Sequence, residues 1–565
     1  MKQFPISLSS WFRPYHKINL AGDLNAGITV GVMLIPQGLA YALIAGLPPI
    51  YGLYAALVPL IVYALLGTSG QLAVGPVAMV SLLIAAGVSQ MAESGTETYL
   101  ELAILLAFMV GVIQLALGLL RFGTVTNFLS HPVLSGFTSA AAIIIGMAQL
   151  KHLVGIPIPG DENVFIIALH AAQNITTFHP ITLAIGIGGI LVILLAKRIS
   201  PRLPGGILAV ALATGLVFWA GLDNQGVAIV GEVPAGLPSF SLTFLTLEHV
   251  RGLLPTALAI ALVGFMESIA VAKSIASKNG YSIEPNRELV ALGMANVAGS
   301  FFSSFPTTGG FSRSAVNNQA GSKTGLSSLV SATVVGLTLL FFTPLFTFLP
   351  KALLASIVIV AVVGLLDFAE VKYLWRVNRT DLALLALTFI TTLLLGIEEG
   401  ILTGLVLSLL SFVNQASKPH MAVLGRLPNQ EVFRNVDRFT EAERIPGVLI
   451  FRVDASLFFG NVDVVRDAIE LAVGLNAETR VLIFDLYPVN RIDSTALHSL
   501  SKLHDWLGSK DISLYLSGVK GPVRDVLFKA GLTEKIGADH FFDHIYPASE
   551  SAKRVRDAYL EREPS

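Results

Sequence analysis

The sequence predicts a polytopic α-helical membrane protein with a small α/β domain at its C-terminal end. Of the 565 residues, 53% are hydrophobic and only 13% are charged, which is the composition of a membrane protein with many spans. Apolar segments separated by short loops follow one another from about Asp23 to Val413, and the chain then becomes polar. These two observations separate a membrane domain from the region that follows it.

Charge and residue usage exclude several functions. The net charge is -1, so no global basic field indicates a nucleic acid partner. The chain has no cysteine, which excludes disulfides, thiolate metal sites and iron–sulfur clusters. The scattered histidines lack metal-ligand spacing, so we expect no metal site. We also expect no other cofactor and no enzymatic reaction.

Fourteen hydrophobic segments are predicted to cross the membrane within residues 23–416. They lie at roughly 23–45, 49–67, 74–89, 100–120, 125–149, 179–197, 205–221, 250–277, 289–303, 311–320, 325–345, 350–366, 381–397 and 399–414. The third, ninth and tenth are short or are broken by glycine and proline. Residues 1–22 form an N-terminal segment without a cleavable signal.

The positive-inside rule tests this count. With a cytoplasmic N-terminus, Lys151, Arg251 and Lys351 fall in outside loops, and a larger set of basic residues falls inside. The inside set is Arg121, Lys197, Arg198, Arg202, Lys278, Arg287, Lys323, Lys372, Arg376 and Arg379. This asymmetry predicts an even number of spans with both termini cytoplasmic, in the cell membrane and, for a bacterium, in the inner membrane.

An inverted repeat is predicted from two broken helices in corresponding places. In the first half, a helix kinked at Pro36 leads to a short span that opens at Gly75-Pro76. In the second half, a helix with a central Glu267 leads to a short span that opens at Gly310. Seven spans per half invert the second copy, so the two short helices would point their N-termini at each other. The two repeats cover about residues 23–221 and 250–416.

The stretch Phe305–Asn317, FPTTGGFSRSAVN, breaks every rule for a spanning helix. Pro306 and a glycine pair interrupt it, and Arg313 puts a full charge in an apolar region, which is by default a functional-site hypothesis. The unpaired amides at the start of its short helix would bind an anion. An interfacial loop or a helix kink is the alternative for one such break, but two matching breaks favour an anion cradle.

Glu267 lies in a long uncharged stretch between Arg251 and Lys273. Desolvation disfavours its charged form, which suits proton coupling, because an ionised Glu267 would repel an anion and a protonated one would not. The alternative is a structural carboxylate paired with Arg313 or Lys273.

Neutral hydrogen-bonding groups lie at the same level as Glu267 along the chain's broken helices. For each hydroxyl among them, the alternative is a hydrogen bond back to its own helix. They are Gln37, Tyr41, Thr307, Thr308, Ser312 and Ser314.

Residues 417–446 are predicted to form a polar linker, and a small soluble domain follows at 447–560. Strands at 448–459, 480–487 and 513–518 alternate with amphipathic helices, which predicts a mainly parallel or mixed sheet. The helices are Val462–Val473, Ser494–Trp506 and Val523–Ala530. The turn before the second helix offers Asp493 or Ser494 as a cap, with a phosphorylatable hydroxyl or a partner-docking edge as the alternative.

These residues together resemble the sulfate permease (SulP) family of anion transporters, and most closely its plant and bacterial sulfate transporters. The supporting stretches are Leu47–Tyr54, Gly67–Leu82, Phe128–Phe137, Met266–Ala270, Gly310–Asn317 and Leu353–Leu366. The C-terminal part resembles the STAS domain that follows the membrane unit in that family. The resemblance therefore covers nearly the whole chain.

The resemblance implies a core of spans 1–4 and 8–11 that moves like an elevator against a gate of spans 5–7 and 12–14. It also implies a homodimer and a cytoplasmic STAS domain that can bind a partner. By motif match, the anion site comprises Gln37, Tyr41, Pro76, Val77, Ala78, Phe311, Ser312 and Arg313. Glu267 would be the proton-coupling residue, since a glutamate there is associated with protons rather than sodium. Thr495 matches the phosphorylated position of the related anti-sigma-factor antagonists.

We therefore expect a secondary active transporter that takes up sulfate together with protons, the anion being held between the N-termini of half-helices 3 and 10. Bicarbonate, chloride or nitrate exchange and C4-dicarboxylate transport are alternatives within this class. An anion channel, a voltage-responsive motor and a sensor that signals through the STAS domain are alternatives from other classes.

Overall fold

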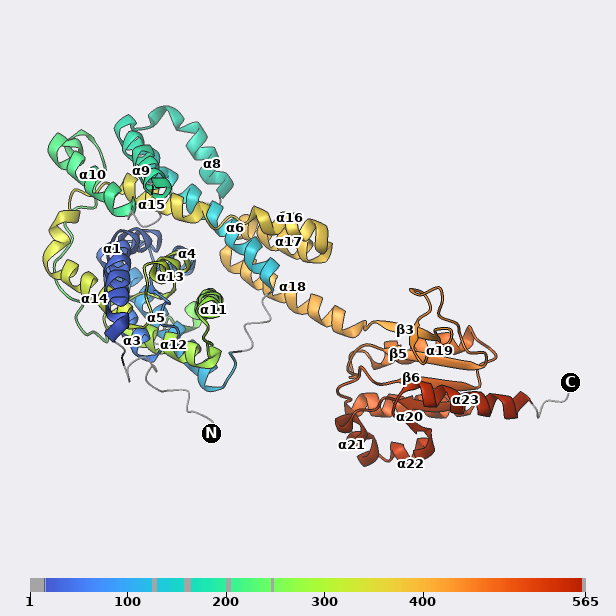
Figure 1. The fold of residues 1–565 in the computed structure, drawn as a ribbon. Coiled ribbons are helices and arrows are strands. Elements are labelled where there is room, and N and C mark those ends of the chain that lie inside the picture. The colour runs from blue at the N-terminus through green and yellow to red at the C-terminus, as the bar shows by residue number, and fades with distance from the viewer. Residues whose placement is uncertain are drawn as a thin grey trace. The chain divides into compact units, whose positions relative to one another are not determined.

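A computed structural model describes residue 15 and residues 17–123, 130–156, 164–199, 205–244 and 248–560. The chain forms two compact units that divide between Ser408 and Leu409. The first unit holds the apolar helices and the second holds a mixed sheet with its own helices (Figure 1). Arg202 and the first part of the Phe128–Phe137 motif lie outside the described residues.

The first unit is built from helices and two very short strands. Within the described residues, seven helical segments are long and apolar enough to cross a membrane, and several shorter apolar helices accompany them. The helices are α1 (Leu20–Ile44), α2 (Ile50–Ala55), α3 (Val58–Leu66), α4 (Ala78–Val88), α5 (Glu97–Leu119), α6 (His131–Ala148), α7 (Leu150–Val154), α8 (Val164–Gln173), α9 (Pro180–Ile199), α10 (Gly205–Ala220), α11 (Val250–Asn279), α12 (Pro285–Ser300), α13 (Phe311–Gln319), α14 (Leu326–Leu337), α15 (Lys351–Val363), α16 (Phe368–Val377), α17 (Arg379–Leu395) and α18 (Ile397–Ser417). The strands are β1 (Val74–Gly75) and β2 (Thr308–Gly309). The count of fourteen spans and the inverted repeat stay predictions.

The helices of this unit pack in two groups (Figure 1). We call α1–α5 with α11–α14 the first helix group, in which α5 packs on α12 and α1 packs on α14. We call α6–α10 with α15–α17 the second helix group, in which α9 packs on α10 and α15, and α6 on α17. Segments far apart in sequence are therefore neighbours, because each group combines an early and a late part of the chain.

Small residues allow the closest helix contacts in the first helix group. A Cβ atom added at Gly111 of α5 would lie 2.6 Å from the backbone nitrogen of Val297, and one at Gly293 of α12 would lie 2.6 Å from that of Leu115. No side chain fits at such distances, so the two backbones approach each other directly. Close approach of this kind gains van der Waals contact where lipid supplies no hydrophobic driving force between helices.

Two fully buried carboxylates hold loops at one end of the first helix group. Asp23 of α1 accepts hydrogen bonds through Oδ1 from the backbone amides of Lys323 and Thr324, at 2.7 and 3.0 Å. Glu288 of α12 accepts one through Oε1 from the amide of Thr68, at 2.6 Å. Each carboxylate therefore satisfies backbone groups beyond a helix end, and donors to the charged form compensate for its burial.

The second unit is a six-stranded mixed sheet in the order β4–β3–β5–β6–β7–β8. Strands β5 to β8 run parallel, while β3 is antiparallel to both β4 and β5. The strands are β3 (Met421–Arg426), β4 (Phe433–Asn435), β5 (Val448–Val453), β6 (Val481–Asp485), β7 (Ser513–Ser517) and β8 (Phe541–Phe542). The helices are α19 (Val462–Gly474), α20 (Ser494–Gly508), α21 (Gly521–Lys529), α22 (Leu532–Ile536) and α23 (Ile545–Leu560). The predicted mixed sheet is confirmed.

Both faces of this sheet are buried. Leu482 and Phe484 of β6 belong to the core that also contains side chains of α19–α22. Val481 and Ile483 point to the opposite face, where they pack with Ala548 and other residues of α23. Successive strand residues point to opposite faces, so a strand covered on both sides becomes an unbroken apolar run.

The predicted linker at 417–446 is corrected by the structure, because part of it belongs to the sheet. Helix α18 continues to Ser417, and β3 and β4 then form between Met421 and Asn435. Ala422 and Leu424 are buried in the core on the α23 side. The segment is polar on average, but β3 alternates between buried and partly exposed residues, as a strand with one covered face does.

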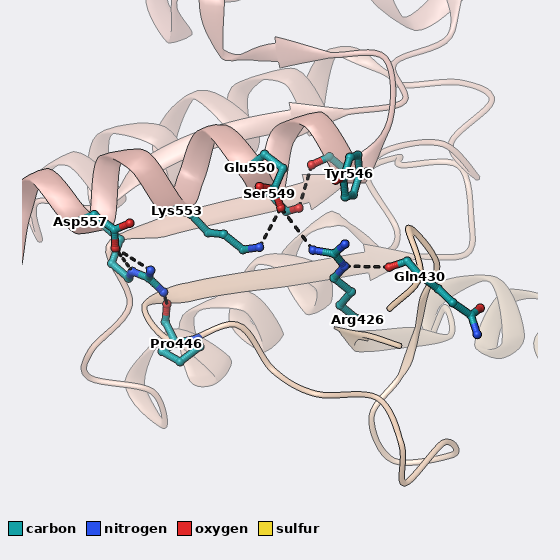
Figure 2. A network of polar contacts seen from close by, with 9 residues as sticks. Arg426, Gln430, Pro446, Tyr546, Ser549, Glu550, Lys553 and Asp557 are labelled. Atoms are coloured by element: carbon teal, nitrogen blue, oxygen red, sulfur yellow. Dashed lines mark hydrogen bonds and ion pairs between the residues drawn. The ribbon is translucent and has the colours of Figure 1, made fainter. Parts of the chain in front are cut away.

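Helix α23 was not predicted, and Figure 2 shows the polar network beside it. Arg426 of β3 and Lys553 of α23 both donate to Glu550 Oε1, at 3.3 and 2.7 Å. Arg426 also donates through Nε to the Gln430 carbonyl at 2.7 Å. Glu550 is well exposed, so this ion pairing adds only about 0–1 kcal/mol. Apolar burial under α23 therefore contributes most to its attachment.

Asp485, at the end of β6, predicts a pH dependence for the second unit. Burial raises the pKa of this carboxyl, although it accepts hydrogen bonds from the Tyr487 amide and the Ser517 hydroxyl. The folded state therefore binds the proton more tightly than the unfolded chain, and this stabilisation is lost as pH rises through the raised pKa. We expect Asp485→Asn to increase amide protection of β6 and β7, by a margin that grows as pH rises through the raised pKa of Asp485 and then levels off.

Hydrogen–deuterium exchange on the full chain, corrected for the intrinsic effect of pH, measures this margin. Asp525→Asn, at an exposed position on α21, is the matched control and should leave the protection factors unchanged. A margin that stays constant or shrinks as pH rises would contradict the assignment.

Candidate functional site

The two broken segments cross each other inside the first helix group. Strands β1 and β2 pair antiparallel, with Val74 opposite Gly309. The amide of Gly310 extends the ladder by donating to the Ala73 carbonyl over 3.1 Å. The short helices α4 and α13 therefore begin close together, because each follows directly from its strand of the crossing.

Serine side chains form hydrogen bonds with backbone groups of the crossing that do not pair between the two short strands. Ser268 Oγ on α11 accepts a hydrogen bond from the Gly309 amide at 2.8 Å. Ser314 Oγ on α13 accepts one from the Ala73 amide at 2.9 Å and donates to the Gly310 carbonyl at 2.7 Å. Each of these contacts joins segments that are distant in sequence or stabilises the start of α13.

Asn296 of α12 fixes the chain just before β2. Its Oδ1 accepts a hydrogen bond from the Thr307 amide at 2.8 Å, and its Nδ2 donates to the Thr307 carbonyl at 3.0 Å. Nδ2 also donates to Gln114 Oε1 of α5 at 3.1 Å. Asn296 is fully buried, so it acts as a backbone partner for a segment that cannot pair with a helix of its own.

The starts of α4 and α13 leave backbone donors unused. The first helical bond of α4 runs from the Ser81 amide to the Val77 carbonyl, and that of α13 runs from the Ser314 amide to the Gly310 carbonyl. The three amides before each of these bonds therefore have no carbonyl partner in their helix. Partial positive charge gathers at such an end and favours a bound anion.

Arg313 reaches from α13 to the start of α4. Its Nη1 donates to the Pro76 carbonyl at 2.6 Å and approaches Gln37 Oε1 at 3.5 Å. Its side chain is only 2% exposed, yet Nε and Nη2 have no hydrogen-bond partner within the described residues. A buried guanidinium with two donor nitrogens that bond to no described residue is a candidate contact for an anion.

Gly310 is required at its position by this arginine. A Cβ atom built there would lie 2.8 Å from Arg313 Cζ. Since real Cβ atoms essentially never approach that closely, any larger residue would displace the guanidinium from the start of α4. The second glycine of the sequence motif therefore has a spatial reason, which is room for the charged group.

Glu267 of α11 faces the same region without pairing to it. Its Oε2 is buried and has no hydrogen-bond partner within the described residues. No described lysine or arginine nitrogen lies within 4.0 Å of its carboxylate, so the alternative of an ion pair with Arg313 or Lys273 is not formed here. Both charges are therefore available to something that enters between them.

A cavity of about 550 Å³ joins these groups. The first helix group lines it with Thr29, Met33, Pro36, Gln37, Tyr41, Val77, Ala78, Met79, Glu267, Gly310, Phe311, Ser312, Arg313, Ala315, Val316 and Gln319. The second helix group lines it with Ile193, Lys197, Gly205, Gly206, Ile207, Ile357, Val360 and Ala361, and the turn after α15 adds Gly364 and Leu365. The cavity thus lies between the two helix groups.

The cavity extends toward the end of the bundle at which α1 begins. Thr29 lies in the first half of α1, and Gln319 is the last residue of α13. The hydrogen bond from Asn25 Nδ2 to the Ala320 carbonyl, at 3.0 Å, places these two helix ends beside each other. A path from the half-helix starts to this end therefore follows one side of α13.

The structure brings most of the predicted site residues together on this cavity. Pro76 does not line it, but its carbonyl holds Arg313. Thr307, Thr308 and Ser314 also do not line it. The Ser314 hydroxyl bonds back to its own helix, which is the alternative given above, whereas the hydroxyls of Thr307 and Thr308 bond to Asn296 of α12 and Ser268 of α11. The predicted residues on the wall are Gln37, Tyr41, Val77, Ala78, Glu267, Phe311, Ser312 and Arg313.

Sequence reasoning missed the residues that hold the crossing together. Asn296 and Gln114 appear in the sequence as polar residues with apolar neighbours on both sides, and Ser268 directly follows Glu267. That was the available signal, because a buried polar group in such a helix needs a partner. Its partner could not be named, since Gln114 and Asn296 are 182 residues apart.

In the second unit, Asp493 is the helix cap that was one of the two alternatives. Its Oδ1 accepts a hydrogen bond from the Ala496 amide, and its Oδ2 accepts one from the Phe459 amide, both at 2.8 Å. Thr495 is exposed in the first turn of α20. Phosphorylation at Thr495 stays a prediction.

Among the described residues, no cluster of histidine, aspartate or glutamate could hold a metal ion.

Known proteins are similar in sequence to this chain, and two family models match its two parts. Residues 20–388 match the sulfate permease family, and residues 440–552 match the STAS domain. The chloroplastic sulfate transporter 4.1 of Arabidopsis thaliana is 40% identical over 542 residues, which cover 93% of this chain and 79% of that protein. A probable sulfate transporter of Mycobacterium tuberculosis, strain CDC 1551 / Oshkosh, is 35% identical over 554 residues, covering 96% of this chain and 97% of that protein.

Solved structures share the fold. Murine solute carrier 26 family member A9, an anion transporter in the inward-facing state, matches with a TM-score of 0.90 and 26% identity over 96% of this chain and 93% of that chain. The transmembrane domain of a cyanobacterial bicarbonate transporter matches with a TM-score of 0.61 and 24% identity over 72% of this chain and 100% of that chain. The second likeness concerns the fold alone.

Asn296→Ala should destabilise the protein, because it removes the partner of the buried Thr307 amide and the donor to Gln114 Oε1. A buried donor that loses its partner costs about 1–3 kcal/mol. Thermal unfolding of the purified chain in detergent measures the loss. Asn224→Ala, at an exposed position, should change stability by no more than about 0.5 kcal/mol. Equal midpoints for both variants would contradict the role given to Asn296.

Proposed function

Because the chain belongs to the sulfate permease family and carries a STAS domain, we propose that it is a secondary transporter that takes up sulfate together with protons. Relatives named as sulfate transporters, among them the Arabidopsis and Mycobacterium proteins, support the choice of anion. The proposed site is the cavity between the two helix groups, with the anion held at the starts of α4 and α13.

One observation carries the proposal, which is the unused donor capacity around this cavity. Arg313 has two nitrogens without a partner among the described residues, and the first amides of α4 and α13 have none in their helices. A tetrahedral oxyanion has four acceptor oxygens that can take hydrogen bonds from several directions. Sulfate therefore suits converging donors on two helices and a guanidinium better than a spherical ion does.

Glu267 is the proposed coupling residue. It lines the cavity with Arg313, and its Oε2 has no partner within the described part of the chain. An ionised carboxylate here would oppose the anion, whereas a protonated one removes a charge and can donate a hydrogen bond to it. Anion and proton would therefore favour each other in the cavity, which is what coupled uptake requires.

Alternating access would come from movement of the first helix group against the second. The proposed anion contacts lie on α1, α4, α11 and α13 of the first helix group, whereas α9, α10 and α15 supply the opposite wall. With a cytoplasmic N-terminus, the cavity extends toward the cytoplasm, because it reaches the end at which α1 begins. Elevator motion, a homodimer, both cytoplasmic termini and a STAS-domain partner are parts of this proposal.

Uptake of labelled sulfate into proteoliposomes, with and without an inward proton gradient, tests the function. We expect saturable uptake that the gradient drives, and weaker competition by nitrate, bicarbonate and succinate than by unlabelled sulfate. Uncoupled current would indicate a channel, and binding without flux would indicate a sensor. Preferential uptake of one of the competitors would show that this anion, and not sulfate, is the substrate.

Glu267→Gln should abolish the stimulation of uptake by the proton gradient, because the amide cannot change its protonation. Exchange of sulfate for sulfate without a gradient should continue, since glutamine resembles the protonated carboxyl in shape and charge. Sulfate accumulation is measured at several outside pH values, with Glu93→Gln at an exposed position as control. Gradient-driven accumulation that persists in the Glu267 variant would refute the coupling role.

Arg313→Ala should weaken sulfate binding by about tenfold or more, since a charge-assisted contact of a guanidinium with an oxyanion contributes about 1.5–3 kcal/mol. The half-helix amides remain, so some binding should survive. Isothermal titration of the purified chain with sulfate gives the affinity. Arg251→Ala, at an exposed position outside the cavity, is the control. An unchanged affinity in Arg313→Ala would remove this arginine from the site.

A further inference from the structure

We infer that Lys197 supplies a second cationic contact to the anion, from the wall opposite Arg313, and that it favours divalent over monovalent oxyanions. The inference rests on the proposed function and specifies its selectivity. The sequence predicts Lys197 only as an inside-loop charge. The structure instead places it on the cavity that holds Arg313 and Glu267.

Lys197 belongs to the last turn of α9 and is exposed to the cavity. It lines the wall formed by the second helix group, together with Gly205 and Gly206 at the start of α10. Those two glycines carry no side chains that could screen the ammonium group from the cavity. A long flexible side chain with a compact charge can follow an ion that enters there.

The charges around the cavity are few. Arg313, Glu267 and Lys197 are the charged residues among those that line it. Lys197 forms no ion pair or hydrogen bond with another described residue, so its charge is not used elsewhere. The cavity therefore presents two cations and one titratable carboxylate. When Glu267 is protonated, the net charge of the residues that line the cavity comes from Arg313 and Lys197 alone.

This charge balance matches a dianion. Sulfate carries two negative charges, and Arg313 neutralises one of them. The half-helix starts contribute only partial charges, each equivalent to about half an elementary charge. A second full cation on the opposite wall attracts a dianion about twice as strongly as a monoanion at the same distance. A monovalent oxyanion such as nitrate is already neutralised by Arg313 and gains little from Lys197.

The contact also joins the two helix groups. Arg313 is held by the Pro76 carbonyl within the first helix group, whereas α9 packs against α10 and α15 in the second. An anion between Arg313 and Lys197 would therefore touch both groups at once. Removal of Lys197 leaves the Arg313 side of the site intact, which makes its contribution separable from anion binding as such.

Titration of the purified full chain with sulfate and with nitrate, at a pH that keeps Glu267 in one state for all variants, tests the inference. Lys197→Gln should weaken sulfate binding about threefold to fivefold and nitrate binding less than twofold, as for loss of one exposed charge contact. Lys197→Arg should restore the preference for sulfate, because it keeps the charge. Arg198→Gln is the matched control, since Arg198 neighbours Lys197 but does not line the cavity.

The outcomes separate this inference from the function on which it rests. Equal sulfate affinity in Lys197→Gln and the unmodified chain would overturn the second contact. An equal loss for sulfate and nitrate, or the same loss in Arg198→Gln, would overturn the selectivity and leave only general attraction. An unmodified chain that binds neither anion would instead refute the proposed function.

Discussion

Backbone groups that leave a helix inside an apolar environment must find partners within the protein, and the first unit is organised by this constraint. The β1–β2 ladder satisfies the centre of both broken segments. Ser268, Ser314 and Asn296 satisfy the groups on either side. The donors left over are concentrated at the starts of α4 and α13. The candidate site is therefore the place where internal pairing stops.

Charged residues in this unit serve two different purposes. Asp23 and Glu288 are fully buried and bond to backbone amides, so their charges are used to hold loops. Arg313 and Glu267 face one cavity and are not paired with each other within the described residues. A direct pair would have neutralised both. Holding Arg313 on the Pro76 carbonyl keeps a full positive charge available at the crossing.

The two helix groups contribute different kinds of residues to the cavity. The crossing and its supporting side chains all belong to the first helix group, which gives the proposed anion contacts a well-bonded base. The second helix group contributes mostly apolar and small residues to the opposite wall, with Lys197 as its charged member. An ion held mainly by one group and touched by the other is a geometry in which relative movement can change access without dismantling the site.

The sequence by itself determined the membrane class, the two broken segments and the candidates Glu267 and Arg313, because each is a local departure from an apolar helix. Strand periodicity likewise predicted the centre of the second unit's sheet, although β3 and β4 were taken for a linker. Only the tertiary structure decided the partners. Thr68 meets Glu288 across 220 positions, and Lys197 and Arg313 line one cavity built from both halves of the chain. Local patterns report which groups need partners, but only chain topology brings such distant groups together.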